Sequence, residues 1–286
     1  MKIPRGVLYM ATSAFGFSAM GVLVQLASKR LPLGEVVFAR AVITLGISLA
    51  MVRRAGLSPW AGPLRPLVFR GLLGFGGLSG YYIALDRLPL ADATVLQNST
   101  PLLTGVLAWW LLAEPIAWST AIAIACGIAG VALIVRPSGD GLDPVGVIAA
   151  LGGVSCSSVA YVTVRRLSRT VAPLVIVLYF PLIATPLAVP WMLASFTVPG
   201  PVDLLLLVAL GAATQIGQVF LTMALAIESA SRATSLNYLQ VPFAMLWQLT
   251  VFDEFPTAWT LAGACLILGG TLLVARVRGA PPAGPS

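Results

Sequence analysis

The residues most able to do chemistry in this sequence are uncharged polar side chains set inside long apolar stretches. Gln215 and Gln218 lie three residues apart, as do Ser79 and Tyr82, so each pair shares one face of a helix. Polar groups are costly in hydrocarbon, so such side chains face partners or a water-filled cavity. Amides beside aromatic rings suit a zwitterionic or uncharged amphipathic solute, because the rings supply apolar area and the amides orient the polar end.

Further polar groups precede Pro101 and Pro242, in matching parts of the two halves of the chain. These groups are Thr94, Gln97 and Asn98 in the first half, and Thr234, Asn237, Tyr238 and Gln240 in the second. The alternative for each amide is hydrogen bonding between helices, and for each ring it is ordinary packing. The predicted substrate-binding residues are Phe17, Ser79, Tyr82, Gln97, Asn98, Tyr161, Tyr179, Gln215, Gln218, Asn237, Tyr238 and Trp247.

Arg40 is interpreted as the only charge well inside an apolar stretch. It could neutralise a carboxylate of the solute, or it could pair with Glu35 or a helix end for structure. A structural role is favoured, because Arg40 lies within the first two turns and could extend its head group to the interface. Glu114 and Glu254 lie at helix exits beside loops, and we expect them to determine the fold.

Four prolines are predicted to act as hinge or gating residues. Pro101 and Pro242 lie in mid-span, where a proline removes a backbone hydrogen bond and permits bending. Pro181 and Pro186, together with Pro190, predict that the seventh apolar stretch is the most irregular. The alternative for each is a static kink.

The elements that position these residues are apolar helices. The chain has 286 residues, of which 58% are hydrophobic and 9% charged. A soluble domain carries about a quarter charged residues, so most of this surface must face lipid. We expect an all-α integral membrane protein with ten spans, at residues 6–28, 33–52, 67–85, 91–112, 116–135, 145–164, 174–195, 203–226, 230–251 and 257–275.

Composition also excludes several classes of protein. The net charge is +7, but no stretch dense in Lys or Arg is present to carry phosphate contacts, so we expect no nucleic-acid partner. There is no His, and the three cysteines fall in apolar runs without metal-site spacing, which predicts no metal and no cofactor. The basic N-terminus resembles a signal peptide, but its apolar run continues from Gly6 to about Ser28, which predicts a retained first helix.

The distribution of Lys and Arg predicts the orientation. If the N-terminus is cytoplasmic, twelve of these residues fall on the cytoplasmic side and four on the other. Both termini are then cytoplasmic, as an even number of helices requires. The twelve are Lys2, Arg5, Arg53, Arg54, Arg65, Arg70, Arg165, Arg166, Arg169, Arg232, Arg276 and Arg278.

The chain also repeats itself at an offset of about 140 residues. The segment LAEPIAW, with Glu114 and Trp118, matches FDEFPTAW, with Glu254 and Trp259. This divides the chain into two repeats, 1–139 and 140–279, with a disordered tail at 280–286. Five helices are an odd number, so the repeats must cross the membrane in opposite senses. Inverted repeats are typical of secondary transporters, with substrate bound near the midplane between the halves.

The duplicated motifs resemble the drug/metabolite transporter superfamily, EamA type. They are the mid-span prolines, the glutamates at the helix exits, Arg40 in FARAVI, and the glycine-punctuated segments CGIAGVALIV and ACLILGGTLLV. The resemblance covers essentially the whole chain and implies a ten-helix transporter of small organic metabolites, often an exporter. Within the family the chain is most similar to aromatic-amino-acid exporters (YddG-like), which implies the bacterial inner membrane. Arg40 has no Arg counterpart in the second repeat, where Phe180 stands.

The function expected from these observations is a secondary transporter exporting neutral or amphipathic metabolites, above all aromatic or hydrophobic amino acids, by alternating access. Its partners are a small-molecule substrate and the lipid bilayer, and ten spans can form a complete cavity in a monomer. A nucleotide-sugar or phosphate-ester exchanger would need several buried Lys or Arg, and the sequence offers one. A membrane-embedded enzyme would need a nucleophile with a base, paired acids or metal ligands, so an enzyme is not expected.

Overall fold

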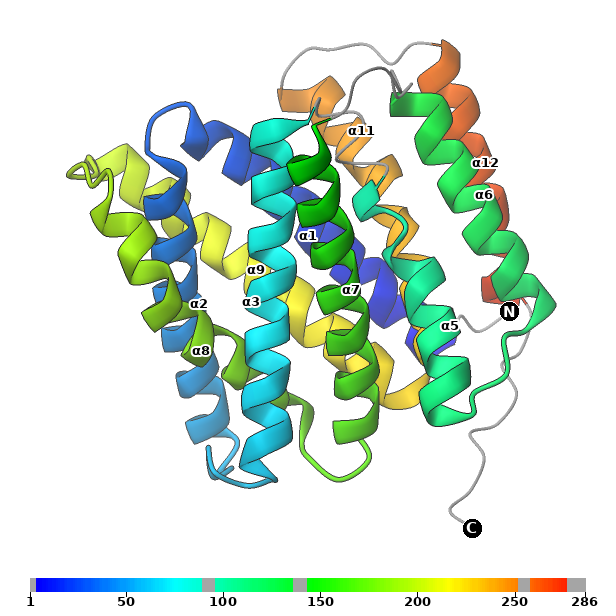
Figure 1. The fold of residues 1–286 in the computed structure, drawn as a ribbon, viewed down its shortest axis with the longest axis horizontal. Coiled ribbons are helices and arrows are strands. Elements are labelled where there is room, and N and C mark those ends of the chain that lie inside the picture. The colour runs from blue at the N-terminus through cyan, green and yellow to red at the C-terminus, as the bar shows by residue number, and fades with distance from the viewer. Residues whose placement is uncertain (1–3, 89–95, 136–142, 252–257, 277–286) are drawn as a thin grey trace.

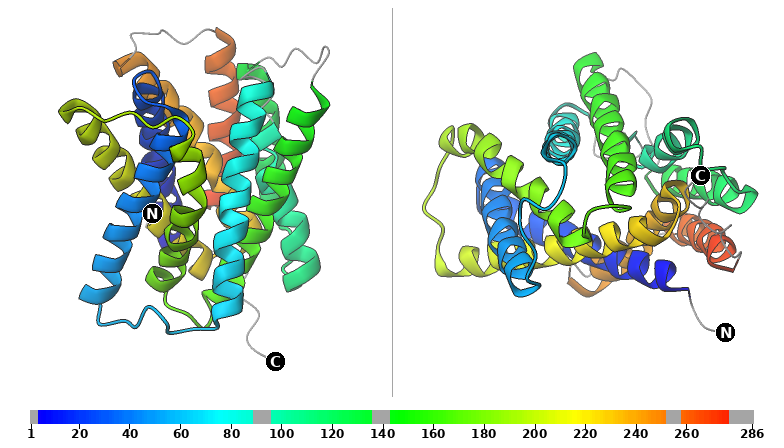
Figure 2. Two further views of the ribbon diagram at one scale, coloured as in Figure 1. Left: turned by 60° about the vertical axis from the view of Figure 1, so that its left-hand side comes forward. Right: turned by 90° about the horizontal axis from the view of Figure 1, so that it is seen from below.

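The structure is a computed structural model that describes residues 4–88, 96–135, 143–251 and 258–276, and this part of the chain contains helices but no strand. Figures 1 and 2 show these helices packed side by side in one bundle. The helices of the first repeat are α1 (Arg5–Ser28), α2 (Leu33–Arg54), α3 (Leu64–Arg87), α5 (Thr100–Leu112) and α6 (Trp118–Val135). Those of the second are α7 (Pro144–Leu167), α8 (Pro173–Leu193), α9 (Pro201–Ile227), α10 (Ala230–Ser235), η1 (Leu236–Leu239), α11 (Gln240–Val251) and α12 (Ala258–Arg276).

Prolines set the starts of most long helices. Pro32 and Pro63 immediately precede α2 and α3, while Pro144, Pro173 and Pro201 occupy the first positions of α7, α8 and α9. A proline is favourable there because the first helical N–H groups have no partner within the helix. Between these starts the segments are apolar, and in hydrocarbon a helix satisfies every backbone hydrogen bond internally.

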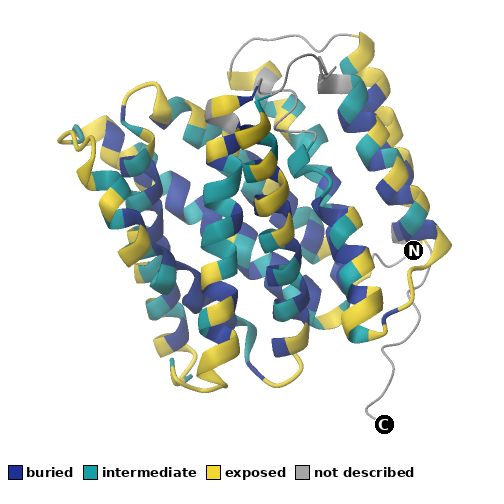
Figure 3. Cartoon of the chain, in the orientation of Figure 1, coloured by how far each residue is buried: buried dark blue, intermediate teal, exposed yellow. Residues whose placement is uncertain are grey.

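The surface of the bundle is that of a membrane protein. Large apolar side chains such as Trp110 and Trp118 are exposed by 73% and 84%. Figure 3 shows buried residues concentrated where helices meet and exposed residues on the outward faces. Among the described residues, five helices are long and apolar enough to cross a membrane, namely α1, α2, α7, α8 and α9. Three shorter apolar stretches are Thr100–Leu112, Trp118–Leu133 and Ala258–Val274.

Helix pairing follows the internal repeat. The main pairs are α3 with α7 and α1 with α9, and each becomes the other when the two repeats are exchanged. The pairs α2 with α8 and α6 with α12 join equivalent helices of the two repeats. Figure 1 shows α3 and α7 in front of the α1–α9 pair, which crosses the view at a slant. The helices of the two repeats are therefore interleaved.

Glycines allow the two principal pairs to approach closely. A Cβ atom on Gly80 of α3 would lie 2.6 Å from the Ala149 carbonyl oxygen of α7. In the equivalent pair, a Cβ on Gly16 of α1 would lie 2.8 Å from the Gly217 nitrogen of α9, and the Ser13 hydroxyl donates to the Gly217 carbonyl at 2.8 Å. Small residues at helix crossings bring backbones into van der Waals contact in membranes.

The fourth and ninth spans are discontinuous. In the fourth, a turn at Asn98 and Ser99 separates a short helical stretch from α5, so that Pro101 starts a helix instead of interrupting one. In the ninth, the 3₁₀ segment η1 separates α10 from α11, and Pro242 lies in the first turn of α11. The prediction that these prolines lie in mid-helix is wrong at Pro101, because the chain has already broken before it.

The seventh span also differs from its prediction. α8 runs as one helix from Pro173 to Leu193 through three internal prolines, Pro181, Pro186 and Pro190. The expectation that it is the most irregular span is wrong, because neighbouring helices hold it in register on several sides. The Thr185 hydroxyl also donates to the Pro181 carbonyl at 2.7 Å. The ninth span is the more irregular one.

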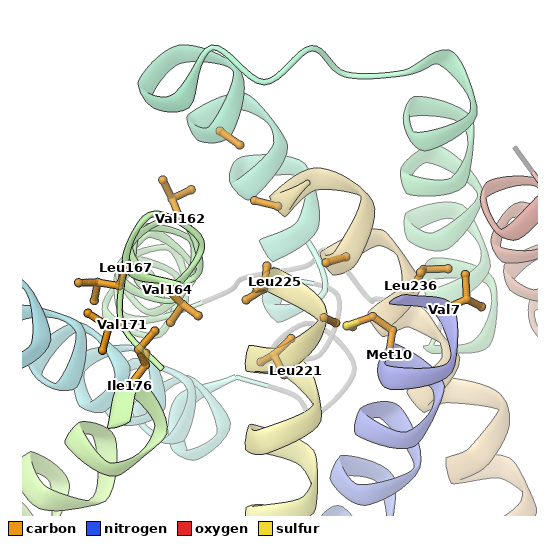
Figure 4. Close-up of a cluster of buried hydrophobic side chains, with 14 of the residues drawn as sticks. Val7, Met10, Val162, Val164, Leu167, Val171, Ile176, Leu221, Leu225 and Leu236 are labelled. Carbon is orange, nitrogen blue, oxygen red and sulfur yellow. The ribbon is translucent and has the colours of Figure 1, made fainter. Parts of the chain in front are cut away.

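The largest apolar core lies where both repeats meet. Figure 4 shows it formed by side chains from α1, α7, α8, α9, η1 and the turn before α8. Met10, Ile176, Leu225 and Leu236 are all fully buried there. This core packs helices of both repeats against each other.

Candidate functional site

Arg70 is a buried charge that the sequence analysis assigned to a loop side of the membrane. It lies six residues inside α3, about 9 Å along the helix axis. Its side chain is 4% exposed, and its Nη2 donates to Gln218 Oε1 at 3.1 Å. Its Nε and Nη1 have no hydrogen-bond partner among the residues described. The interpretation of Arg40 as the only intramembrane charge is therefore wrong.

Arg40 of α2 is 5% exposed and lies beside the same aromatic ring as Arg70. The guanidinium carbon of Arg40 is 6.0 Å from the ring centroid of Phe180, and that of Arg70 is 5.1 Å from it. The Arg40 Nη1 contacts Met20 Sδ at 3.7 Å. In the described part of the chain neither arginine forms an ion pair.

The suggested pairing of Arg40 with Glu35 is wrong. Glu35 Oε2 instead accepts hydrogen bonds from the Thr197 hydroxyl at 2.9 Å and from the Thr197 backbone at 3.2 Å. Glu35 therefore ties the start of α2 to the segment between α8 and α9. Arg40 stays inside the bundle instead of extending its head group toward the interface.

We call Arg40, Arg70, Phe180 and Gln218 the arginine cluster. Its members come from α2, α3, α8 and α9, so both repeats contribute. Gly74 makes room for it, because a Cβ there would lie 2.6 Å from a ring carbon of Phe180. A guanidinium near an aromatic face is attracted by the ring quadrupole, which offsets part of the cost of burying the charge. Among the predicted residues, the cluster includes Arg40 and Gln218.

Tyr161 and Tyr179 lie near the cluster on neighbouring helices. Tyr161 of α7 is within electrostatic range of Arg70. Tyr179 precedes Phe180 on α8 and is fully buried, and its hydroxyl has no hydrogen-bond partner in the described residues. An orphaned buried hydroxyl is unusual in a folded protein and marks a place where a polar partner fits.

Two predicted residues are used for packing between helices. Gln215 exchanges hydrogen bonds with the Ser48 hydroxyl at 2.9 and 3.1 Å, which joins α9 to α2. Tyr82 is buried against α2 and α8, with its ring 6.4 Å from that of Trp191 in an edge arrangement. These contacts match the alternative interpretations, interhelical hydrogen bonding for Gln215 and packing for Tyr82.

The broken fourth and ninth spans meet each other. The Tyr238 hydroxyl donates to the Asn98 carbonyl at 2.7 Å, at the turn that interrupts the fourth span. Beside this contact, Gln97 Oε1 and Asn237 Oδ1 are buried without a hydrogen-bond partner in the described residues. These amide oxygens are thus buried polar atoms that lack a hydrogen-bond partner in the described part of the chain. Thr94 lies outside the described residues.

The remaining predicted residues are spread more widely. Ser79 Oγ of α3 is buried and has no hydrogen-bond partner among the residues described. Phe17 packs against Gly217, where a Cβ would lie 2.7 Å from its ring. The Trp247 Nε1 donates to the Ser18 hydroxyl at 3.1 Å and its ring lies beside Phe15. These residues do not share one site with the arginine cluster.

A second group of charges lies where α5, α7, α9 and α10 meet, and we call it the paired cluster. Glu114 Oε1 accepts from Arg165 Nε at 2.8 Å, and Oε2 accepts from the backbone of Ala230 at 2.9 Å. Arg165 also donates to the carbonyls of Leu225 and Ala226 at 3.1 Å each. These contacts agree with the fold-determining role expected of Glu114, whereas Glu254 lies outside the described residues.

The open spaces on the bundle do not coincide with the predicted site. A hollow of about 430 Å³ lies between α5 and α7 and has mostly apolar walls, including Leu103 and Val154. None of the predicted substrate-binding residues lines it. Within the described residues, no group of three His, Cys, Asp or Glu side chains is placed to hold a metal ion.

Comparison with proteins of known sequence identifies several relatives over nearly the full length. The chain is 32% identical over 277 residues to the Pseudopaline exporter CntI of Pseudomonas aeruginosa, covering 96% of this chain and 98% of that one. It is 28% identical to the mouse Solute carrier family 35 member G1, covering 93% and 77%. It is 26% identical to the S-adenosylmethionine uptake transporter of Rickettsia conorii, covering 94% and 92%.

A solved crystal structure has the same fold. It superposes with a TM-score of 0.84 at 21% identity and covers 95% of this chain and 96% of the other. The sequence model of the EamA-like transporter family matches this chain twice, at residues 4–136 and 144–276. The two matches contain the helices of the two repeats, and the chain therefore belongs to the EamA-like transporter family of the drug/metabolite transporter superfamily and is a membrane transporter.

Proposed function

We propose that the protein is a secondary transporter that exports small amphipathic metabolites by alternating access between its two repeats, residues 1–139 and 140–279. The observation that carries this proposal is the meeting of the two broken spans, where Tyr238 contacts the Asn98 carbonyl. Substrate sites of inverted-repeat transporters lie at such discontinuous helices, where freed backbone groups and side chains face a cavity. The orphaned oxygens of Gln97 and Asn237 lie in these same spans.

The two repeats cross the membrane in opposite senses, with both termini in the cytoplasm. Support comes from the twelve-to-four bias of Lys and Arg and from helix pairs that interchange when the repeats are exchanged. The protein acts as a monomer in the bacterial inner membrane, because ten spans enclose a cavity without a partner. In intact cells, a membrane-impermeant thiol reagent added outside should label a single cysteine at Ser28, and should label one at Ser168 only after the cells are opened.

The substrate is an amino-acid-like metabolite, and export is the direction. The relative at 32% identity is named an exporter of pseudopaline, while the relative named for S-adenosylmethionine is an uptake transporter. Amino acids with aromatic or hydrophobic side chains serve as the first probes, because half-buried rings such as Tyr161 offer them apolar area. Pro101, Pro181, Pro186 and Pro242 are the hinge and gating candidates.

Counterflow in proteoliposomes tests this proposal. Vesicles are preloaded with unlabelled phenylalanine, glutamate, S-adenosylmethionine or buffer, and labelled solute of the same kind is added outside. We expect uptake that depends on the preload and needs no imposed proton gradient. Asn237→Ala should weaken it, because the amide is buried beside the break, while Thr12→Ala on the outer face of α1 serves as the matched control.

A lack of preload-dependent uptake for every solute would contradict export of amino-acid-like metabolites. Equal losses of counterflow in Asn237→Ala and Thr12→Ala would instead show that the broken spans do not bind the substrate. A strict requirement for a proton gradient would replace facilitated export with coupled export.

A further inference from the structure

We propose that the arginine cluster binds an oxyanion group of the transported solute, so that the substrate class is organic anions carrying a carboxylate or a phosphate. This inference rests on the proposed transport function and assigns its substrate class. It also reverses the argument that the sequence made against anionic substrates, which counted a single buried arginine. Two are present, on different helices, beside one aromatic ring.

The first step is that Arg70 is buried without compensation. Its side chain is 4% exposed, and only Nη2 has a partner, the neutral oxygen of Gln218. The Nε and Nη1 atoms have none in the described part of the chain. Burying an ionised group is expensive unless it is paired and hydrogen-bonded. A bidentate anion would supply what these nitrogens lack, because the planar fork of a guanidinium matches carboxylate and phosphate.

The second step is that Arg40, beside the same Phe180 ring, also has no ion-pair partner among the described residues. Its only side-chain hydrogen-bond partner among the described residues is the thioether of Met20, which is a weak acceptor. The carboxylate nearest along its own helix, Glu35, forms no ion pair with it: Oε2 accepts from Thr197, and Oε1 has no hydrogen-bond partner among the described residues. Two like charges beside one ring repel each other in a region of low dielectric, and a shared anion removes that repulsion.

The third step concerns position. Phe180 is the repeat equivalent of Arg40, so the two residues meet across the axis that relates the repeats. Gln218 belongs to the second repeat and Arg70 to the first. An anion held here therefore contacts both repeats at once. Arg70 lies on α3 and Gln218 on α9, so such a contact changes when these helices move relative to each other during alternating access.

The cost of the cluster argues against a purely structural role. The ring of Phe180 attracts both guanidinium groups, but a cation–π contact compensates a buried charge only in part. Elsewhere in the described chain, the buried Arg165 of the paired cluster is fully provided with a carboxylate and two carbonyls. Where the buried Arg165 has a structural role, its guanidinium group therefore has hydrogen-bond partners.

The test is thermal unfolding of the full-length protein in detergent, titrated with potassium citrate, potassium glutamate or potassium phosphate. Potassium chloride at matched ionic strength is the reference. We expect at least one of the three anions to raise Tm with saturation, citrate or glutamate if the group is a carboxylate and phosphate if it is a phosphate. Arg70→Gln and Arg40→Gln should each weaken the apparent affinity about tenfold or more.

The matched control is Arg65→Gln, an exposed arginine five residues earlier on α3 that should keep the wild-type response. Arg70→Lys should restore the charge but not the affinity, because an ammonium cannot bind bidentately. Arg70→Met supplies a readout without any ligand. We expect its Tm in chloride to equal or exceed that of the wild type, because an uncompensated charge has been removed.

Saturable stabilisation that survives in Arg70→Gln and Arg40→Gln, or no stabilisation by any of the three anions, would overturn the proposal. So would a large fall of Tm in Arg70→Met, since that would make the arginine a structural group. Counterflow of phenylalanine separates this failure from that of the transport function. Preload-dependent phenylalanine uptake without an anion response would support the transport proposal and contradict the anion site. An anion response without uptake of any probe would support the anion site and contradict the transport proposal.

Discussion

The paired cluster and the arginine cluster both contain buried arginine, but they differ in how many partners that arginine has. In the paired cluster, Arg165 has a carboxylate partner in Glu114 and donates to two helix-end carbonyls. In the arginine cluster, Arg40 and Arg70 lie beside one ring and only Arg70 contacts the neutral amide of Gln218, with no ion pair among the residues described. Burial alone therefore does not distinguish a structural charge from a binding charge, but the supply of partners does.

The largest expected effect compares the same substitution in the two clusters. Arg165→Met leaves the buried Glu114 carboxylate with only the half-exposed Arg169, 3.8 Å away, as a cation, which should lower the free energy of unfolding by up to about 3–5 kcal/mol. Arg70→Met should lower it by far less or raise it. Chemical unfolding in detergent micelles measures both. Equal losses in the two variants would remove the distinction between the clusters.

A smaller effect is expected where a polar side chain is satisfied within the bundle. Gln215→Leu deletes the amide that exchanges hydrogen bonds with Ser48, leaving that hydroxyl buried, at a cost of about 1–3 kcal/mol. Counterflow should change little, because Gln215 is already satisfied by protein. Unchanged stability with lost transport would move Gln215 from the packing residues to the binding residues.

The contact between the broken spans is expected to contribute less. Tyr238→Phe removes the hydroxyl that donates to the Asn98 carbonyl, which should cost about 1 kcal/mol of unfolding free energy. The ring itself stays packed against Gly127, where a Cβ would lie 2.3 Å from it. A loss as large as that of Arg165→Met would show that this contact stabilises the fold as strongly as the paired cluster does, and would contradict the ranking.

The smallest effect is expected at an exposed ion pair. Arg87 and Asp143 lie 3.3 Å apart with Arg87 about half exposed, so Arg87→Ala should change the unfolding free energy by at most about 1 kcal/mol after solvent screening. Raising the salt concentration should reduce even that difference. The change in unfolding free energy of this variant is the reference with which the changes in the two buried clusters are compared.

Much of the fold could be predicted from the sequence. Ten apolar stretches separated by short polar joins are a strong signal, because hydrocarbon admits little backbone that is not helical. The repeat was also readable from prolines, glutamates and tryptophans at equal spacing. Helix breaks could not be placed, because a proline signals irregularity without saying whether the helix continues through it, as α8 does through Pro181, Pro186 and Pro190.

The candidate site was predicted less well. Gln218 was found from its spacing, but its partner Arg70 was assigned to the loops although it lies three residues inside the predicted span 67–85. Positive charges near the end of a span usually indicate the cytoplasmic side of the membrane. Arg70 was interpreted by that rule, so its burial was not predicted. Gln215 and Gln218 look equivalent in sequence, and only the tertiary contacts show that one meets Ser48 and the other Arg70.

The close glycine contacts of α3 with α7 and of α1 with α9 determine which parts of the protein can move as units. Each pair takes one helix from each repeat, and its backbones touch at Gly80 or at Gly16 with no side chain between them. If the two helices of a pair slid past each other, this backbone contact would be lost. We therefore expect the α3–α7 pair and the α1–α9 pair each to move as one rigid unit in the transport cycle. Labels placed on α3 and α7 should then keep a constant separation, while labels on α3 and α1 change theirs.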